Sequence, residues 1–130
     1  MGDIATYNAA QPAPYAAICD ALSLAIAHGL PQSLAKVWHG GPVWFLNDNP
    51  IVGYWVRKTG VQLLFWSGKS FDDPALKPEG KFQAAAAHYT DAAQINPANL
   101  TRWLSVAALR QWDYAQIVKR RGVLEKLGDW

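Results

Sequence analysis

The chain has 130 residues, of which 51% are hydrophobic and 17% charged, and its formal net charge is +2. This length predicts a single domain of residues 1–130, and so high a hydrophobic fraction excludes an intrinsically disordered chain. The single cysteine, Cys19, excludes an intramolecular disulfide and a Cys-x-x-Cys site. A protein dedicated to nucleic-acid binding usually has a higher net positive charge, concentrated in one patch or stripe. The composition therefore argues against nucleic acid as the partner.

The N-terminal third is predicted to contain an arm and two helical segments. Residues 1–13 hold Gly, Asn, Gln and Pro without a period, which predicts a flexible arm or a loosely docked lead-in. The uncharged run 4–19 contains polar residues and proline and follows no basic residue, so it matches neither a signal peptide nor a membrane span. We therefore expect a cytoplasmic protein without a membrane partner. Apolar spacing predicts a helix over 14–28 and a short helical turn over 31–38.

The centre of the chain is predicted to form an antiparallel sheet. Residues 36–66 hold seven of the sixteen aromatic residues. Apolar runs separated by turn formers predict three strands, over residues 43–47, 51–57 and 61–66. Both faces of the hairpin made by the last two strands lack charge. Either helices cover both faces, or one face is an aromatic surface that binds something.

The C-terminal half is predicted to be a loop, an ambiguous segment and a helix. Residues 67–81 are rich in turn formers and longer than a usual connection, which indicates a functional loop or a short helical turn. In residues 82–91, four consecutive alanines favour helix, whereas Phe82, Tyr89 and Thr90 suit a strand. Asn96 and Pro97 predict a helix start, and apolar residues three and four apart continue to Gly122, as one long helix or two with a bend.

Motifs for catalysis and metal binding are incomplete. Gly68-Lys69-Ser70 follows a strand as in a phosphate-binding loop, but Leu63 stands where that loop requires glycine. No serine lies in a Gly-x-Ser-x-Gly elbow, so the sequence favours a protein without enzymatic activity. Asp72 and Asp73, with Glu79, form the densest acidic group and are a conceivable hard-cation site, although a helix cap or a solvated loop explains them better.

Three stretches of the sequence carry a family resemblance: WHGGPVWFLNDNPIVGYWVRKTGVQLLFWSGKSF, KFQAAAAHYTDAAQIN and LTRWLSVAALRQWDYAQIVKRRG. Together, over roughly residues 34–127, they resemble the YdhG-like bacterial domains of unknown function. The resemblance implies an α+β fold, with N-terminal and C-terminal helices packed on an antiparallel sheet of four or more strands. It also implies that residues 83–89 are a strand. Some relatives are described as frataxin-like intracellular iron chaperones, a role that needs an acidic face. This chain has ten acidic residues, with Asp72 and Asp73 as the close pair.

We predict a non-enzymatic binding or accessory domain whose aromatic sheet and glycine loop form a pocket for a small molecule or a partner protein. The candidate ligand-binding residues are His39, Trp44, Trp66, Lys69, Trp112 and Tyr114. Under this hypothesis the domain needs neither a cofactor nor a metal, and it is a monomer or a small homo-oligomer. The alternatives are an iron chaperone, with iron bound near Asp72 and Asp73, and third a protein whose aromatic and basic residues stack the bases of single-stranded nucleic acid.

Overall fold

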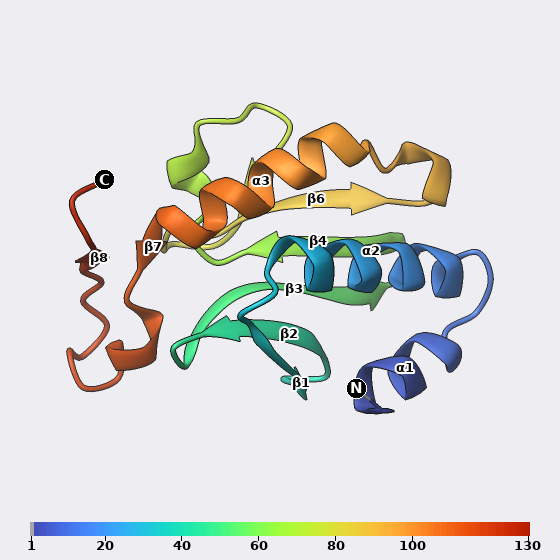
Figure 1. The fold of residues 1–130 in the computed structure, drawn as a ribbon, viewed down its shortest axis with the longest axis horizontal. Coiled ribbons are helices and arrows are strands. Elements are labelled where there is room, and N and C mark those ends of the chain that lie inside the picture. Colours follow the sequence, from blue (N-terminus) through green and yellow to red (C-terminus); the bar gives the residue numbers. More distant parts are fainter. Residues whose placement is uncertain (1) are drawn as a thin grey trace.

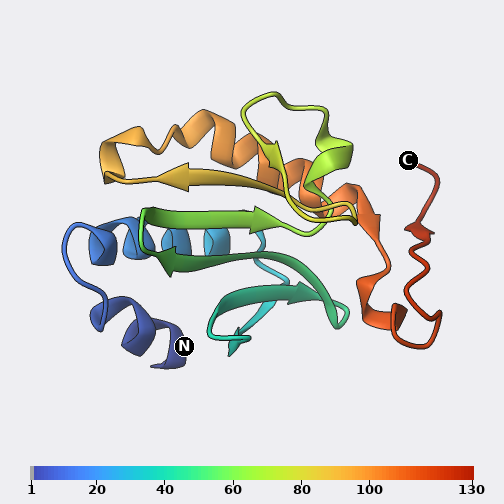
Figure 2. The same ribbon diagram turned by 180° about the vertical axis from the view of Figure 1, so that it is seen from behind.

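Helices lie against one face of a six-stranded antiparallel sheet in the computed structural model, which describes residues 2–130 (Figure 1). The strand order is β1-β2-β3-β4-β6-β5, and β7 and β8 form a separate two-stranded sheet. The opposite face of the sheet, seen from behind, has no helix of the described residues in front of it (Figure 2). This arrangement confirms the predicted α+β class with an antiparallel sheet.

The elements have the following bounds. The helices are α1 (Gly2–Ala9), α2 (Tyr15–Gly29) and α3 (Pro97–Leu109), with 3-10 turns η1 (Gly68–Phe71), η2 (Ala92–Gln94) and η3 (Tyr114–Gln116). The strands are β1 (Leu34–Trp38), β2 (Gly41–Leu46), β3 (Asn49–Arg57), β4 (Gly60–Phe65), β5 (Lys77–Pro78), β6 (Ala85–Tyr89), β7 (Gln111–Trp112) and β8 (Lys126–Leu127).

The core lies between the sheet and helices α2 and α3. Alternation along β3 and β4 turns one set of side chains towards the helices, because successive residues of a strand point to opposite faces. Hydrophobic side chains of both layers are buried there: Val52, Tyr54, Val61, Leu63 and Phe65 from the sheet, and Ile18, Leu22, Ile26, Leu100, Trp103 and Leu104 from the helices. Helix α3 begins as predicted, since the Asn96 side chain accepts a hydrogen bond from the backbone N–H of Asn99.

The N-terminal residues are a docked helix, so the prediction of an arm over residues 1–13 is wrong for α1. Ile4 and Asn8 of α1 are 4% and 3% exposed. The Tyr54 hydroxyl donates to Asn8 Oδ1 over 2.6 Å, and the backbone N–H of Val56 donates to the Tyr7 hydroxyl over 3.0 Å. These polar side chains dock the helix by specific hydrogen bonds, which leave little hydrophobic period in the sequence.

Residues 31–38 do not form the predicted helical turn. Leu34–Trp38 is strand β1, which pairs with β2 in a hairpin that sets Leu34 opposite Phe45 and Trp38 opposite Gly41. His39 and Gly40 make the turn with φ angles of 53° and 83°. Glycine adopts this left-handed conformation without steric cost, so Gly40 favours a tight hairpin turn directly after the residues for which a helical turn is predicted.

The remaining strands largely follow the prediction. Strands β2, β3 and β4 cover the three predicted segments, and Ala85–Tyr89 is strand β6, as the family resemblance implies. Strand β6 pairs antiparallel with β4, with Tyr89 opposite Val61. The predicted helix to Gly122 is wrong beyond Leu109, because α3 ends there and the chain continues through β7, η3 and β8.

Candidate functional site

Aromatic side chains occupy the face of the sheet opposite α2 and α3. Trp55 on β3 and Trp66, the residue directly after β4, alternate with core residues and so project to the other side. The ring centroids of Trp55 and Trp66 are 5.8 Å apart, Trp66 and Trp38 6.2 Å, and Trp38 and Phe45 5.3 Å. These four residues, which we call the aromatic face, form a continuous series of ring contacts. They lie on the side of the sheet that has no helix in front of it in Figure 2.

Two hairpin features fix the positions of these rings. A side chain at Gly41 would place its Cβ 2.6 Å from the Trp55 ring, so glycine there leaves room for the indole. The Trp55 indole N–H donates to the carbonyl oxygen of His39 over 3.0 Å, and the His39 ring lies 4.1 Å from the Trp38 ring. The turn between β1 and β2 therefore brings His39, which is exposed, to the edge of the aromatic face.

The aromatic face forms one side of a groove of about 880 Å³. This is within the range of about 300–1,000 Å³ that is usual for small-molecule sites. The other side comes from the segment before β6 and from η3 and the residues after it. The aromatic groove, as we call it, is lined by Gln32, Leu34, Ala35, Lys36, Trp38, His39, Phe45, Asn47, Asp48, Pro50, Trp66, Phe82, Tyr114, Ala115, Ile117 and Val118.

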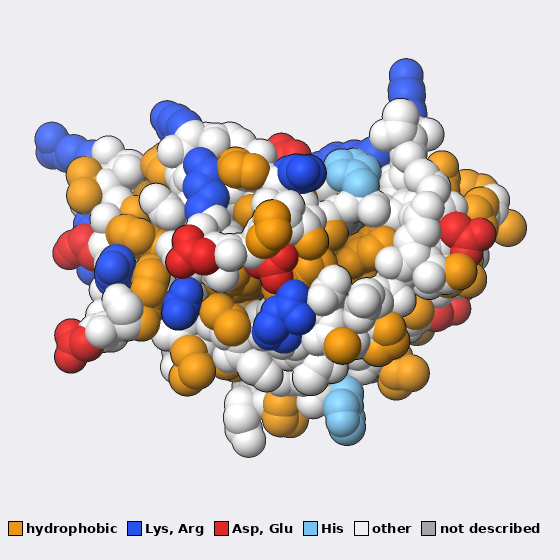
Figure 3. Space-filling model, turned by 90° about the horizontal axis from the view of Figure 1, so that it is seen from above, with side chains coloured by type: hydrophobic (Ala, Val, Ile, Leu, Met, Phe, Trp, Pro, Cys, Tyr) orange, Lys and Arg blue, Asp and Glu red, His pale blue; other side chains and the backbone are white. Residues whose placement is uncertain are grey.

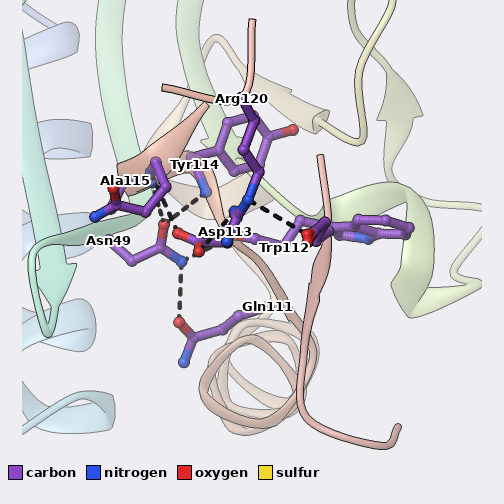
Figure 4. A network of polar contacts seen from close by, with 9 residues as sticks. Asn49, Gln111, Trp112, Asp113, Tyr114, Ala115 and Arg120 are labelled. Carbon is purple, nitrogen blue, oxygen red and sulfur yellow. Dashed lines mark hydrogen bonds and ion pairs between the residues drawn. The ribbon is translucent and has the colours of Figure 1, made fainter. Parts of the chain in front are cut away.

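Asn49 fixes the C-terminal side of the groove (Figure 4). Asn49 is the first residue of β3, directly after the turn from β2, and it is buried, at 2% exposure. The amide nitrogen donates to the Gln111 side chain and to the Trp112 carbonyl, both over 3.0 Å. The amide oxygen accepts from the backbone N–H groups of Tyr114 and Ala115 over 2.9 and 3.1 Å. One side chain thus uses all its hydrogen-bonding capacity to hold β7 and η3 on the sheet.

A partly buried ion pair between Asp113 and Arg120 closes the loop that follows η3. Asp113 is 8% exposed and accepts from Arg120 Nη1 over 2.7 Å and from the backbone N–H of Gln116 over 3.3 Å. Arg120 Nε also lies 3.3 Å from a Glu125 carboxylate oxygen. Because both ends of the 113–125 segment are tied to one guanidinium, Ile117 and Val118 are held between them at the groove.

Tyr114 joins the two parts of the groove's second side. Its hydroxyl accepts a hydrogen bond of 3.0 Å from the backbone N–H of Gln83, and its ring meets the Phe82 ring edge-on at 6.5 Å. Burial raises the pKa of Tyr114, so the hydroxyl is neutral at physiological pH. The phenol therefore acts as a rigid wall of the groove, with its polar tip already paired to the backbone.

Three of the six predicted ligand-binding residues come together and three do not. His39, Trp66 and Tyr114 line the aromatic groove. Trp44 is 1% exposed in the core beside Tyr54, so its interpretation as a ligand contact is corrected to a core position. Lys69 and Trp112 lie outside the groove, where the Lys69 ammonium donates to Gly80 O and the Trp112 indole to Ser70 Oγ.

The sequence analysis misses three aromatic residues of the groove: Trp38, Phe45 and Phe82. Strand alternation could have identified the first two, since both lie in the β1–β2 hairpin and their rings lie in one series of contacts with Trp66. The prediction of a helical turn over 31–38 left this alternation unrecognised. Phe82 and the apolar pair Ile117 and Val118 carry no such signal, because their neighbours are set by contacts between distant segments.

The two acidic residues Asp72 and Asp73 interact with basic and other donor groups of the fold itself. Asp73 accepts from Arg102 over 2.6 Å, from the Trp103 indole over 2.8 Å and from the backbone N–H of Ala75 over 3.0 Å. These donors, Arg102 first, lower the pKa of Asp73 to about 2. The Asp72 side chain is 88% exposed and lies 3.9 Å from Arg110. Within residues 2–130, no group of three or more His, Cys, Asp or Glu is arranged to hold a metal ion.

The fold and the groove define a small α+β domain with an aromatic site on the open face of its sheet. No family model matches the sequence, and no curated protein matches it closely. Among solved structures, the chain is similar to a DUF1801-family protein, YdhG, from Bacillus subtilis. The TM-score is 0.59 at 11% sequence identity, over 93% of each chain. This likeness confirms the YdhG-like fold that the resemblance implies. No helix within residues 2–130 has both the length and the apolar character to cross a membrane.

Proposed function

We propose that this domain is a non-enzymatic binding or accessory protein and that its aromatic groove holds a small molecule. The observation that carries the proposal is the convergence of Trp38, Phe45, Trp66, Phe82 and Tyr114 on one groove of about 880 Å³. A concave site of this size and aromatic lining is the usual form of a small-molecule site, whereas protein partners more often use flatter surfaces. A partner protein that inserts an aromatic side chain would use the same surface.

The groove chemistry favours binding over catalysis. Its ionisable lining residues are Lys36, His39, Asp48 and Tyr114, and the Tyr114 hydroxyl is already paired with the backbone. Nucleophilic catalysis requires a nucleophile within hydrogen-bonding distance of a base. Among residues 2–130 the cysteine is buried in the core, with its pKa raised to about 12 by burial, and no histidine side chain is hydrogen-bonded to a serine.

The two alternatives have less support. An iron chaperone needs exposed carboxylates in a group, but Asp73 is already bound by three donors. On the face seen from above, acidic side chains are scattered among basic and hydrophobic ones (Figure 3). Lysine and arginine are more frequent at the end where the C-terminal segment lies, but they do not form a continuous stripe in this view. Stacking of single-stranded nucleic acid therefore stays a prediction from the sequence.

A ligand screen by thermal shift tests the proposal. A ligand that binds only the native state at 100 times its Kd adds about 2.7 kcal/mol to the free energy of unfolding, which corresponds to a rise in Tm of roughly 10 °C. We expect small aromatic compounds among the hits. Binding, measured by calorimetry, should fall at least tenfold in Trp66→Leu, because the central ring of the aromatic face is lost.

The matched control is Trp130→Leu, which removes an indole outside the groove. Trp130 packs on Trp112 and its indole N–H donates to backbone carbonyls of the C-terminal segment. We expect this variant to bind the hits as the unchanged protein does. A screen without hits, or hits that bind Trp66→Leu equally well, would contradict the proposal.

A further inference from the structure

Two lysine ammonium groups lie over aromatic rings of the groove. Lys36 Nζ is 5.0 Å from the centroid of the Phe45 ring, and Lys81 Nζ is 5.1 Å from the centroid of the Phe82 ring. Phe45 and Phe82 belong to the two opposite sources of the lining, the sheet and the segment before β6. Positive charge is therefore present on both sides of the site, although the net charge of the whole chain is only +2.

These ammonium groups are available to a ligand. Both lysines are exposed, and within residues 2–130 neither is in an ion pair with a carboxylate. The acidic residue in the groove lining is Asp48, in the turn between β2 and β3. An exposed contact between an ammonium and a ring is weak, whereas a hydrogen bond between an ammonium and an anion is about twice as strong as one between neutral groups. The lysines can therefore leave the ring faces for an anionic group.

We propose, building on the small-molecule function above, that the aromatic groove selects a planar aromatic molecule that bears a carboxylate or a phosphate. The ring of the ligand stacks on Trp38 and Trp66, whose centroids are 6.2 Å apart and whose planes are inclined by 34°. This tilted pair of neighbouring rings presents an extended π-surface to a flat ring. The anionic group lies at the rim, within reach of Lys36 or Lys81.

The charge pattern distinguishes this ligand class from a cation. Aromatic cages that bind ammonium ligands use ring faces that are free of other cations. Here two such faces, those of Phe45 and Phe82, already carry the chain's own ammonium groups. A cationic ligand would have to displace them and would then remain close to two like charges, so the groove disfavours it.

A series of naphthalene compounds with one ring system and different substituents tests the proposal: 1-naphthoate, 1-naphthyl phosphate, 1-naphthamide and 1-naphthylmethylamine. Calorimetry on the full chain in low salt gives the Kd of each. We expect the two anions to bind about threefold to fivefold more tightly than the neutral amide, which is the range for one or two exposed ion pairs, and the amine to bind most weakly. The advantage of the anions should decline with added salt. The tighter of the two anions identifies the substituent.

Charge-neutralising variants assign the effect to the groove. Lys36→Gln with Lys81→Gln should weaken naphthoate binding to the level of the amide and leave the amide unchanged. Lys58→Gln removes one positive charge from the exposed turn between β3 and β4, outside the groove, and should leave naphthoate affinity within twofold. Because these side chains are exposed, both the double variant and Lys58→Gln are expected to fold.

Four outcomes would overturn the proposal. Equal binding of amide and anions that is lost in Trp66→Leu would reject charge selection and leave the proposed small-molecule function intact. Preferential binding of the amine would reverse the sign of the selection. A loss of naphthoate affinity in Lys58→Gln equal to that in the double variant would show only a general charge effect. If the naphthalene series does not bind while the thermal-shift screen yields other ligands, the ligand class is wrong but the binding function is not.

Discussion

At the scale of single residues, the buried polar side chains of the described residues are nearly all hydrogen-bonded within the fold. Asn49, Asn8 and Asp113 are each less than 9% exposed, and each makes at least two hydrogen bonds. Among the described residues, the Trp44 indole N–H is the buried side-chain donor without a partner. Buried polar groups cost free energy unless they are paired, so these residues specify how distant segments fit together.

Asp73 should make stability depend on pH. Its carboxylate accepts hydrogen bonds from Arg102 and Trp103, and its pKa is lowered from 3.8 to about 2. Because the folded-state pKa lies below the unfolded one, this stabilisation is fully present above about pH 4 and is lost as the pH falls towards 2. We expect Asp73→Asn to lower the free energy of unfolding by about 1 kcal/mol at pH 7 and by less at pH 2.5, measured by urea denaturation.

The matched control is Asp72→Asn, one residue earlier. The Asp72 side chain is 88% exposed and only 3.9 Å from Arg110, a distance at which exposed pairs contribute little. This variant should change stability by a few tenths of a kcal/mol at either pH. An equal effect of the two substitutions, or an Asp73→Asn effect that grows as the pH falls, would show that the carboxylate is not stabilised by its donors.

At the scale of elements, helix α1 is held by a polar contact more than by a hydrophobic stripe. The Tyr54 hydroxyl has no exposure and donates to Asn8 Oδ1 over 2.6 Å. Asn8 Nδ2 lies 3.2 Å from both Asp20 and Ser23 of α2. Asn8→Ala leaves the hydroxyl buried without its acceptor, so we expect a loss of about 1–3 kcal/mol in the free energy of unfolding.

The double variant Asn8→Ala with Tyr54→Phe separates this contact from other effects. When the hydroxyl and its acceptor are both removed, no unpaired buried group remains between them. The double variant should therefore be less destabilised than the sum of the single variants, by roughly 1 kcal/mol. If the losses in the free energy of unfolding of the two single variants add up to that of the double variant, α1 is held by Ile4 and the Tyr7 ring, without a contribution from this hydrogen bond.

Much of the sheet could be predicted from the sequence, whereas its edges could not. Apolar runs bounded by clear turn formers define β3 and β4 within one or two residues, because both signals are local in the sequence. The position of β6 depended on the family resemblance, since its alanines favour helix by propensity. Helix α3 ends at Leu109 although the spacing of Trp112 and Ala115 would continue it.

The end of α3 has a tertiary cause. Arg110 takes an extended conformation with φ −109° and ψ 90°, and its side chain donates to Ser70 O over 2.7 Å. The next residue, Gln111, pairs with Asn49, which lies 62 residues earlier in the chain. Contacts over such separations leave no local pattern. The aromatic face was therefore predictable in outline, but the second side of the groove was not.

At the scale of the whole molecule, the groove exists because two parts of the chain that are distant in sequence meet at the turn between β2 and β3. The sheet supplies the aromatic face, and the C-terminal segment after α3 supplies the opposite side at one end of the sheet (Figures 1 and 2). Asn49 makes four hydrogen bonds across this junction, to Gln111, Trp112, Tyr114 and Ala115. The shape of the groove thus depends on one buried amide.

Asn49→Ala should loosen the C-terminal segment and weaken ligand binding together. Removing four hydrogen bonds at a site with 2% exposure leaves backbone groups of 112–115 unpaired, so we expect a loss of about 3 kcal/mol or more in the free energy of unfolding. Gln111→Ala removes only one of the four partners and should cost about 1 kcal/mol.

Hydrogen exchange in Asn49→Ala should accelerate at the Tyr114 and Ala115 amides, which donate to Asn49. Ligand affinity should fall more in Asn49→Ala than in Gln111→Ala, since Tyr114 and Val118 lose their fixed positions beside Trp66. Fast exchange at these amides with unchanged affinity would mean that the aromatic face binds without the C-terminal segment.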